Sequence, residues 1–302
     1  MDKYQNVESP VTGGITQQLE TISVSTIIED YKKLLDLDVQ EYFEGLNEIA
    51  IRRCEDTGFR FYYPATIFAD EKFYAFLQKK DFYYSNWNWE HKEALKNLAP
   101  GSKVLEVGCG TGSFIFSLKE KGFDCTGLEL NKAAAEVCRK KGLIVYNELL
   151  DEHLLKHAGK YDAVCAFQVL EHVYDVRSFI NECLQCLKPG GKLIMGVPNN
   201  NPYFFKYDKY HTLNLPPHHS GLWNKESFEK LPGFFPMRVD KIKIEPLIHR
   251  EYFLMVYMKQ IKLEGLYKKI RKIGPGIINR LSWPLKFIVP GKCILAIFIE
   301  DN

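Results

Sequence analysis

Near the end of its first third, the 302-residue chain reads Val104-Leu105-Glu106-Val107-Gly108-Cys109-Gly110-Thr111-Gly112. The first four residues have the character of a buried strand, and the glycines predict a tight turn that opens a helix. Glycine tolerates positive φ angles and lets a ligand approach the backbone closely. The first N–H groups of a helix also lack partners within the helix. The stretch therefore predicts a ligand-binding turn at the end of a strand.

An acidic residue ends the next predicted strand. Glu129 follows Gly127-Leu128 and lies seventeen residues after Gly112. A carboxylate in that place can accept hydrogen bonds from both hydroxyls of a ribose. The GxGxG spacing differs from the GxGxxG of dinucleotide-binding folds and is unspecific alone. Together with Glu106 and Glu129 it predicts a nucleoside site.

Strands and helices are predicted to alternate around this turn. The apolar stretches are short and nearly continuous, as in strands that are covered on both faces. We predict strands over 103–107, 123–128, 143–146, 161–167 and 192–197, and helices over 112–121, 131–140, up to about 157, and 175–187. Right-handed crossovers then give an α/β fold with a doubly wound, mostly parallel sheet. Such sheets bind ligands beyond the carboxyl ends of their strands.

Three regions are expected along the chain. Residues 1–100 form an N-terminal lid or substrate subdomain that is helical toward its end, with aromatic clusters at 59–63 and 82–89. Residues 101–200 form the ligand-binding core. Residues 201–302 contain a loop rich in proline, asparagine and histidine, a basic helical insertion near 252–272, and strands near 239–245 and 293–299.

Over residues 103–200 the chain resembles the class I S-adenosylmethionine-dependent methyltransferases. Further matching pieces are Phe167–Val173 and Leu187–Lys192. The resemblance implies a Rossmann-like, seven-stranded sheet and S-adenosylmethionine as cofactor. It implies that Glu129 takes the ribose. The other cofactor residues implied are Glu106, Gly108, Gly110 and Gly112 around the methionine part, Asn147 and Glu148 beside adenine, and Gln168 at the edge of the pocket.

Polar residues follow the fourth and fifth predicted strands. Glu171 and His172 come just after the fourth strand, and Pro216-Pro217 precedes His218 and His219 in the loop after the fifth. Methyl transfer to a hydroxyl is an in-line displacement that must also dispose of a proton. Either loop histidine could accept that proton as general base, with His219 slightly favoured, or Glu171 or His172 could serve. The rate should then rise with pH through roughly 6.5.

A divalent metal ion is the alternative to a general base. Glu171, His172 and one loop histidine could together hold Mg²⁺ or Mn²⁺, which would acidify the hydroxyl. This region is similar to the ubiquinone-pathway O-methyltransferases and to the small-RNA 3′-end methyltransferases, which carry Glu-x-x-Glu-His here. Gln168 replaces the first acid in this chain, which removes one charged ligand.

The N-terminal flank resembles a segment of methyltransferases of polysaccharide and glycan biosynthesis. The matching residues run from Arg53 to Pro64, but Thr57 replaces the second cysteine of the knuckle, so no zinc is expected. Residues 83–91 resemble an aromatic lid of the same group. The resemblance implies O-methylation of a hydroxyl on a sugar or glycan intermediate. A small phenol or quinone precursor, or an RNA end, is the alternative acceptor, and a binding module without turnover is the alternative to an enzyme.

Charge and composition limit the partners. The net charge of +2 gives no reason to expect nucleic acid, although residues 259–292 hold nine bases and one acid. That stretch could contact a membrane surface, a phosphate group or RNA, or be a solvated helix face. Neither a signal peptide nor a membrane span is recognised, so we expect a cytoplasmic protein. The eight cysteines are expected to be free thiols, and the oligomeric state is not predicted.

Overall fold

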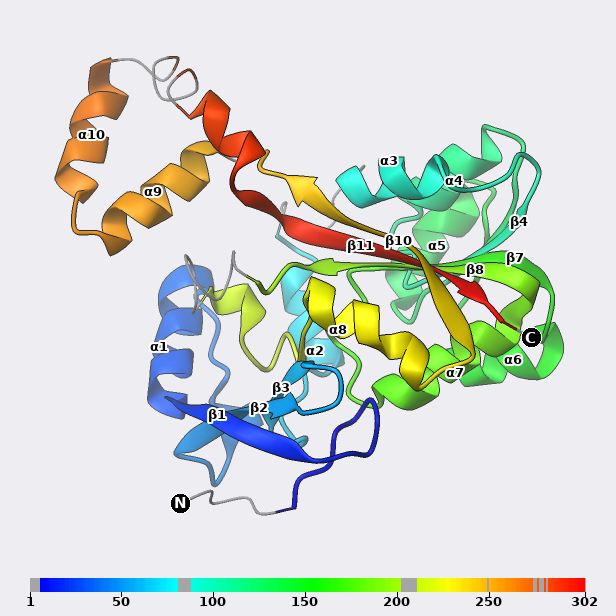
Figure 1. Cartoon of the computed structure of the whole chain (residues 1–302), viewed down its shortest axis with the longest axis horizontal. Helices are drawn as coiled ribbons and strands as arrows, with labels where there is room; N and C mark the ends of the chain where they lie inside the picture. The colour runs from blue at the N-terminus through cyan, green and yellow to red at the C-terminus, as the bar shows by residue number, and fades with distance from the viewer. Residues whose placement is uncertain are drawn as a thin grey trace.

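The computed structural model describes residues 6–80, 88–201, 211–248, 250–273, 276, 280 and 282–301, apart from the side chains of residues 71, 260, 271 and 273. These residues form a sheet of seven strands and a sheet of four strands. In Figure 1 the smaller sheet lies below the larger one, and α9 (Arg250–Gln260) and α10 (Glu264–Ile273) stand apart at the upper left.

The larger sheet has the strand order β10-β11-β8-β7-β4-β5-β6. Its strands are β4 (Lys103–Val107), β5 (Asp124–Leu128), β6 (Ile144–Tyr146), β7 (Tyr161–Phe167), β8 (Leu187–Pro198), β10 (Met237–Pro246) and β11 (Pro290–Glu300). Strands β4 to β8 pair in parallel, whereas β11 is antiparallel to both β8 and β10. The expected doubly wound, mostly parallel sheet is therefore confirmed.

Both faces of this sheet are buried. Successive side chains of a strand point to opposite faces, and on β7 Ala163 and Cys165 join one apolar cluster while Val164 and Ala166 join another. Helices must therefore cover the sheet on both sides. These helices are α3 (Trp89–Leu95), α4 (Ser113–Lys119), α5 (Lys132–Lys140), α6 (Leu150–His157) and α7 (Val176–Cys186). The four of them that the sequence predicted, α4 to α7, end within two residues of the expected bounds.

One strand begins earlier than expected. The sequence Lys188-Pro189-Gly190-Gly191 predicts a break before the fifth strand, yet β8 starts directly after α7 at Leu187. The pairing with β7 is irregular there, because Tyr161 faces Leu187 while Ala163 faces Lys192. The proline and glycines thus form a bulged start of the strand and not a separate loop.

The N-terminal region is helical toward its end, as expected, at Glu71–Leu77 and in α3, but it also contains a sheet that the sequence did not predict. It forms an antiparallel sheet of β1 (Thr16–Ser23), β2 (Glu48–Cys54), β3 (Arg60–Tyr63) and β9 (Gly221–Leu222), with helices α1 (Val24–Leu35) and α2 (Glu71–Leu77). The β1 strand escapes prediction because Gln18 and Glu20 lie on its inward face, while Leu19 is exposed, so the strand shows no apolar alternation. Its buried Ile22 belongs to a third apolar cluster.

Strand β9 belongs to the smaller sheet, although it follows β8 of the larger sheet in the sequence. It belongs to the last third of the chain, yet its Leu222 pairs with Arg60 on β3. The next residue, Trp223, is fully buried, and its ring centroid lies 4.2 Å from that of Phe59. The N-terminal sheet therefore holds the loop before β9 beside the larger sheet.

The remaining elements lie in the last third of the chain and in short turns. The predicted basic helical stretch is confirmed as α9 and α10, and the two predicted late strands are confirmed as β10 and β11. The others are α8 (Lys225–Lys230) and the 3₁₀ helices η1 (Gln40–Phe43), η3 (Thr212–Asn214), η4 (Leu231–Gly233) and η5 (Trp283–Phe287). In the described part of the chain no helix has the length and apolarity needed to cross a membrane.

Candidate active site

The glycine turn joins β4 to α4 in a narrow space. Gly108, Gly110 and Gly112 have φ angles of 71°, 54° and 79°, a region that other residues rarely adopt. A Cβ atom on Gly108 would lie 2.5 Å from Val169 Cγ2, and one on Gly112 would lie 2.7 Å from Leu143 Cδ1. Glycine is thus required here both by the backbone conformation and by the close approach of neighbouring side chains.

Glu129 lies beside this turn, directly after β5. Its carboxylate accepts hydrogen bonds from the backbone N–H of Gly110 at 2.7 Å and of Asn131 at 2.8 Å. Burial raises the pKa of Glu129, while the backbone N–H groups act against that shift. A carboxylate has about four acceptor positions, so two remain after these bonds. The half-buried side chain therefore fits the two hydroxyls of the ribose of S-adenosylmethionine.

The other expected cofactor residues on this side support the backbone. Asn147 donates from Nδ2 to the carbonyls of Glu129 and Leu130, at 2.8 Å and 2.7 Å. A carboxylate oxygen of Glu148 lies 2.7 Å from Nδ1 of the buried His153. Glu106 is buried below the turn, and burial raises its pKa. These contacts fix the floor of the site.

The segment after β7 forms the other side of the turn. Val169, which limits the space at Gly108, lies in this segment between Gln168 and Glu171. Gln168 has a φ of 54° and donates from Nε2 to Glu90 at 3.4 Å. Among the described residues, neither carboxyl oxygen of the buried Glu171 has a hydrogen-bond partner, and burial raises its pKa to about 8. Glu171 is therefore protonated at neutral pH.

Three histidines gather at the end of this segment. The ring centroids of His218 and His219 lie 4.5 Å apart, and that of His172 lies 4.7 Å and 4.8 Å from them. Burial lowers the pKa of His172 to about 4 and that of the two loop histidines well below 6.5, with further lowering from the neighbouring rings. The rings are therefore neutral at pH 7, and the expected midpoint near pH 6.5 is wrong for them.

The hydrogen bonds of two rings define which nitrogen carries the proton. His172 Nδ1 lies 2.6 Å from the carbonyl oxygen of His218, and His218 Nδ1 lies 2.8 Å from that of Leu213. A carbonyl oxygen can only accept a hydrogen bond, so Nδ1 is the protonated nitrogen in both rings. In a neutral imidazole the lone pair is then on Nε2.

A pair of buried asparagines fixes the proton of His219 in the same way. Asn200 donates from Nδ2 to the carbonyl of Pro198 at 3.2 Å, which orients its amide. Its Oδ1 accepts from Nδ2 of Asn214 at 2.8 Å, so Oδ1 of Asn214 faces His219. Nδ1–H of His219 donates to that oxygen at 3.2 Å. Nε2 of His219 is thereby kept as a proton acceptor.

The backbone of the histidine loop is fastened from two directions. Tyr31 donates from its hydroxyl to the carbonyl of Leu215 at 2.9 Å, and Tyr62 donates to that of Asn214 at 3.0 Å. The N–H groups of Ser220 and Gly221 donate to the carbonyl of Glu171, at 2.8 Å and 3.0 Å. The N-terminal sheet and the segment after β7 thus hold the loop together.

The sequence does not indicate the residues that orient His219. Asn200 and Asn214 belong to a polar loop, and nothing in their spacing predicts that their amides meet. For the tyrosines on α1 and β3 the sequence likewise indicates no more than aromatic packing. Trp223, just after this loop, is part of the core, where its ring lies 5.0 Å from that of Phe228.

The expected magnesium or manganese site does not fit the residues that meet. Among the described residues, His172, His218 and His219 could hold a metal ion, with ligand atoms within 4.8 Å of one another, but Glu171 is not part of this group. Mg²⁺ and Mn²⁺ prefer oxygen ligands, whereas three imidazoles suit Zn²⁺ and similar ions. No catalytic step is therefore derived through a metal ion.

Two expected features of the N-terminal flank have different outcomes. Most of the expected aromatic lid, residues 83–87, lies outside the described residues. In the described segment 53–64, Phe59 and Phe61 are buried core residues, and Phe61 pairs with Gly221 of β9. This segment therefore supports the histidine loop.

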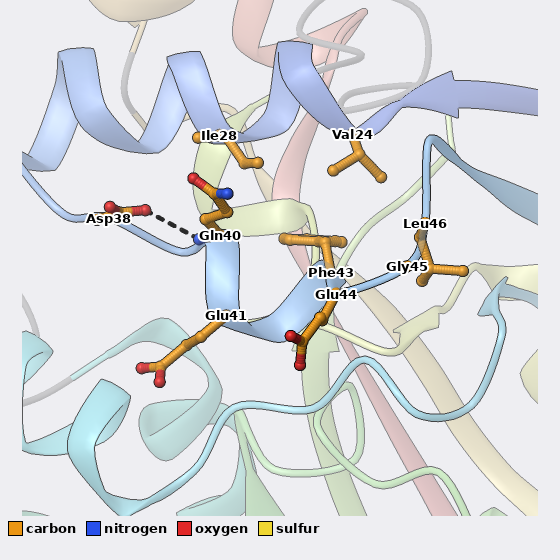
Figure 2. Close-up of a pocket in the computed structure, with 9 residues that line it drawn as sticks. All are labelled: Val24, Ile28, Asp38, Gln40, Glu41, Phe43, Glu44, Gly45 and Leu46. Atoms are coloured by element: carbon orange, nitrogen blue, oxygen red, sulfur yellow. Dashed lines mark hydrogen bonds between the residues drawn. The ribbon is translucent and has the colours of Figure 1, made fainter.

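A separate cavity of about 680 Å³ lies between α1 and η1 (Figure 2). Val24, Ile28, Phe43 and Leu46 form its apolar walls, and acidic side chains lie around it. None of its lining residues is among the predicted site residues, so the cavity is not assigned to the chemistry at the edge of the larger sheet.

A glycine turn with an acid on the next strand, at the carboxyl edge of a doubly wound sheet, defines the class I methyltransferases, and the comparisons agree. The model of the family described as "Methyltransferase domain" matches residues 82–239, just over half of the chain. The chain therefore belongs to this family, and the expected methyltransferase class with S-adenosylmethionine as methyl donor is confirmed.

Individual relatives cover less of the chain. Over 107 residues it is 38% identical to the ubiquinone biosynthesis O-methyltransferase of Escherichia coli, and equally to that of Shigella boydii serotype 18. The match covers 33% of this chain and 45% of each relative, which is less than half of their length. A SAM-dependent methyltransferase from Archaeoglobus fulgidus has a similar fold, with a TM-score of 0.51 and 20% identity over 75% of this chain and all of that one.

Proposed function

We propose that this chain transfers the methyl group of S-adenosylmethionine to a hydroxyl oxygen, with His219 as general base. The observation that carries the proposal is the chain of amides from Pro198 through Asn200 and Asn214, which leaves Nε2 of His219 as a proton acceptor. His219 lies on the edge of the sheet that also carries the glycine turn. A buried histidine held in one tautomer beside a nucleoside site is suited to proton transfer.

The cofactor residues have separate roles in this proposal. Glu129 accepts the ribose hydroxyls. The three glycines, with Glu106 below them and Gln168 beside them, border the methionine part. Asn147 and Glu148 lie at the adenine end. S-adenosylmethionine, when bound, supplies an electrophilic methyl carbon on a sulfonium.

The acceptor side then handles one proton. With S-adenosylmethionine bound, the acceptor oxygen would form a bond to the methyl carbon as the bond between that carbon and sulfur breaks. Nε2 of His219 takes the hydroxyl proton, and the imidazolium is stabilised by Oδ1 of Asn214 at its Nδ1–H. Because burial lowers the pKa of His219, the ring is neutral before the reaction and returns its proton to water readily afterwards.

Two acceptor classes follow from different observations. A hydroxyl of a sugar or glycan intermediate is the first candidate, on the resemblance of residues 53–64. A small phenol or quinone precursor is the second, because a histidine with a lowered pKa is a weak base and a phenol loses its proton more easily than an alcohol. The 38% identity to ubiquinone biosynthesis O-methyltransferases supports the second candidate.

One assay tests the reaction and separates the alternatives. Purified protein is given S-adenosylmethionine with a panel of sugar nucleotides, catechols and short RNA oligonucleotides, and S-adenosylhomocysteine is measured. Turnover with the sugar or the catechol members identifies the acceptor class. Cofactor binding by calorimetry without turnover on any member would instead support a binding module.

Chelation tests the role given to His219. We expect full activity after exhaustive treatment with a chelator, and inhibition by added Zn²⁺, which would occupy the Nε2 atoms of the three histidines. Added Mg²⁺ serves as the control and should have no effect. Loss of activity on chelation that Mg²⁺ or Mn²⁺ restores would replace the general base with a metal ion.

A further inference from the structure

Large apolar side chains are exposed on the part of the chain formed by α9, α10 and η5, here called the α9–η5 tip. The exposed fractions are 52% for Trp283, 69% for Phe287 and 77% for Ile288, with 45% for Leu263 and 48% for Leu266. The sequence between α9 and the start of β11 therefore presents apolar groups to solvent.

These side chains are not needed to hold the tip together. Its own core consists of the buried Leu247 and Phe253, with Leu285 and Val289 packed against them. Tyr267 on α10 is buried and donates to Glu251 on α9 at 3.4 Å. The exposed residues lie outside this small core, so their apolarity has no explanation in the packing of the described residues.

The charge of the tip is opposite to that of the rest of the chain. Residues 250–288 hold nine of the 40 bases and two of the 38 acids, which leaves 31 bases and 36 acids elsewhere. Basic side chains also accompany the apolar ones, since Lys286 Nζ lies 4.5 Å from the centroid of the Trp283 ring. Lys268 and Lys269 are exposed on α10 next to Leu266.

The tip lies at the edge of the sheet that carries the candidate active site. β11 starts at that edge, because its Cys293 pairs with Pro198 at the carboxyl end of β8. β7 and β8 run parallel, and the segment with His172 follows β7. Figure 1 shows α9 and α10 projecting beyond the sheet from this edge.

We infer that the α9–η5 tip docks on an anionic lipid surface. Exposed Trp, Phe, Leu and Ile side chains among lysines match the acyl boundary and the headgroup charge of such a surface. A second copy of the chain that met the tip with its own tip would bring the same positive charge to the contact and be repelled. A nucleic acid would satisfy the lysines but would leave the aliphatic side chains in water. The inference goes beyond the proposed function and does not depend on it.

Vesicle flotation tests the docking directly. The 302-residue chain is mixed with vesicles of phosphatidylcholine alone or with about one quarter of phosphatidylglycerol, at low and high salt. We expect the protein to float with the anionic vesicles at low salt, to release at high salt, and to remain in solution with neutral vesicles. No acceptor or cofactor is present, so the outcome is separate from that of the methyl-transfer assay.

Matched variants assign the binding to the tip. Each basic residue near an anionic surface contributes about 1 kcal/mol, or about fivefold in binding, so Lys268→Ala with Lys269→Ala should weaken vesicle binding about 25-fold. The control is Lys32→Ala with Lys33→Ala, another exposed adjacent pair, and both Lys268 and Lys32 form an ion pair with an acid four residues away. The control pair should bind as the wild type does.

Apolar variants test the second component. Phe287→Ser should weaken vesicle binding roughly tenfold, and Leu155→Ser, at a side chain that is 86% exposed on α6, should not. Circular dichroism shows whether each variant is folded. If a variant is unfolded, the salt and lipid dependence of the wild type still tests the docking.

Three results would overturn the docking. The wild type could fail to float with anionic vesicles at low salt, or the Lys32 and Lys33 control could weaken binding as much as the variant on α10. The protein could also bind a single-stranded RNA probe in the same buffer while ignoring the vesicles, and the tip would then be a nucleic-acid surface.

Discussion

The two sides of the candidate active site are built over different distances in the sequence. On the cofactor side, Gly110 and Glu129 are nineteen residues apart and are joined by one hydrogen bond. On the acceptor side, His219 is oriented by Asn214 and Asn200, while its loop is fastened by Tyr31 of α1 and Tyr62 of β3. The contacts of the cofactor side join residues that are close in the sequence. Those of the acceptor side form only when both sheets have folded.

This difference suggests how the chain divides its tasks. The glycine turn and Glu129 can stay the same while the sequence of the rest of the chain changes. Such an arrangement suits a cofactor that many reactions share. The acceptor side depends on the N-terminal sheet through β9, so changes in that sheet can alter the acceptor site without touching the cofactor. Variants on the two sides should therefore affect different kinetic constants.

The largest effect is expected from His219→Ala. Removal of a general base lowers turnover by roughly 10²–10⁴-fold, so kcat should fall by that factor while S-adenosylmethionine affinity stays the same. Steady-state kinetics and calorimetry measure the two quantities. His218→Ala is the matched control, because it removes a ring of the same size that is stacked on that of His219, and its turnover should stay near that of the wild type. Near-normal turnover of the His219 variant would move the base to another residue.

Glu129→Ala should act on the opposite side. Loss of charge-assisted hydrogen bonds to the ribose should weaken cofactor affinity by about 10- to 100-fold, whereas kcat at saturating cofactor should change much less. Gly110→Val should also weaken binding, and Gly101→Val is its control. Gly101 has a similar φ of 75°, and a Cβ atom there would meet nothing within 4 Å, so both variants carry the same backbone strain. Unchanged affinity in Glu129→Ala would remove this turn as the cofactor site.

The cofactor side and the sheet could be predicted because their signals are local. The alternation of apolar strands and helices between 103 and 198 indicates a mostly parallel sheet. The glycine spacing together with Glu129 indicates the turn. The pairing of β9 with β3 could not be predicted, because it joins Phe61 to Gly221 across 160 residues. The N-terminal sheet could not be predicted either, because β1 exposes Leu19 and turns Gln18 and Glu20 toward the other face, so its sequence lacks an apolar alternation.

The sequence indicated the two histidines of the loop as candidate bases, but it did not predict the tautomer or the pKa of their rings. The sequence places His218 and His219 on a stiff loop, yet the neutral tautomer depends on two amides and a carbonyl that only the fold brings together. Their lowered pKa values arise from burial and from His172, which follows a different strand. Charge states of buried groups depend on such distant neighbours, so a midpoint near pH 6.5 follows from the reference value alone.

Asn214 should have a smaller effect that distinguishes orientation from simple packing. Asn214→Leu removes the acceptor for Nδ1–H of His219, so kcat should fall about tenfold. Asn214→Asp offers a carboxylate instead, which favours the imidazolium and raises the pKa of His219. The rate should then rise with pH in a range where the wild type is flat. Asn199→Leu is the control, because Asn199 is also buried but bonds to the Gly291 carbonyl. Identical pH profiles for the wild type and Asn214→Asp would contradict the orienting role.

Glu171→Gln should have the smallest effect on rate and a measurable effect on stability. The pKa of Glu171 is raised from 4.5 to about 8 by burial, so the folded state holds a proton that the unfolded state has lost between these values. Stability then falls as pH rises through this window, because the folded state binds more protons. Glutamine resembles the neutral acid and cannot ionise. The variant should therefore lose this decline and melt about 5 °C or more above the wild type near pH 9.

Thermal unfolding between about pH 5 and pH 9 measures this difference, with Glu229→Gln on α8 as an exposed control that should follow the wild type. Turnover at pH 7 should stay within about threefold of the wild type, since Glu171 is already neutral there. A large loss of turnover would mean that an ionised Glu171 takes part in the reaction, as base or as metal ligand. Such a result would tie Glu171 to the acceptor side, although its carboxyl oxygens have no hydrogen-bond partner in the part of the chain that the structure describes.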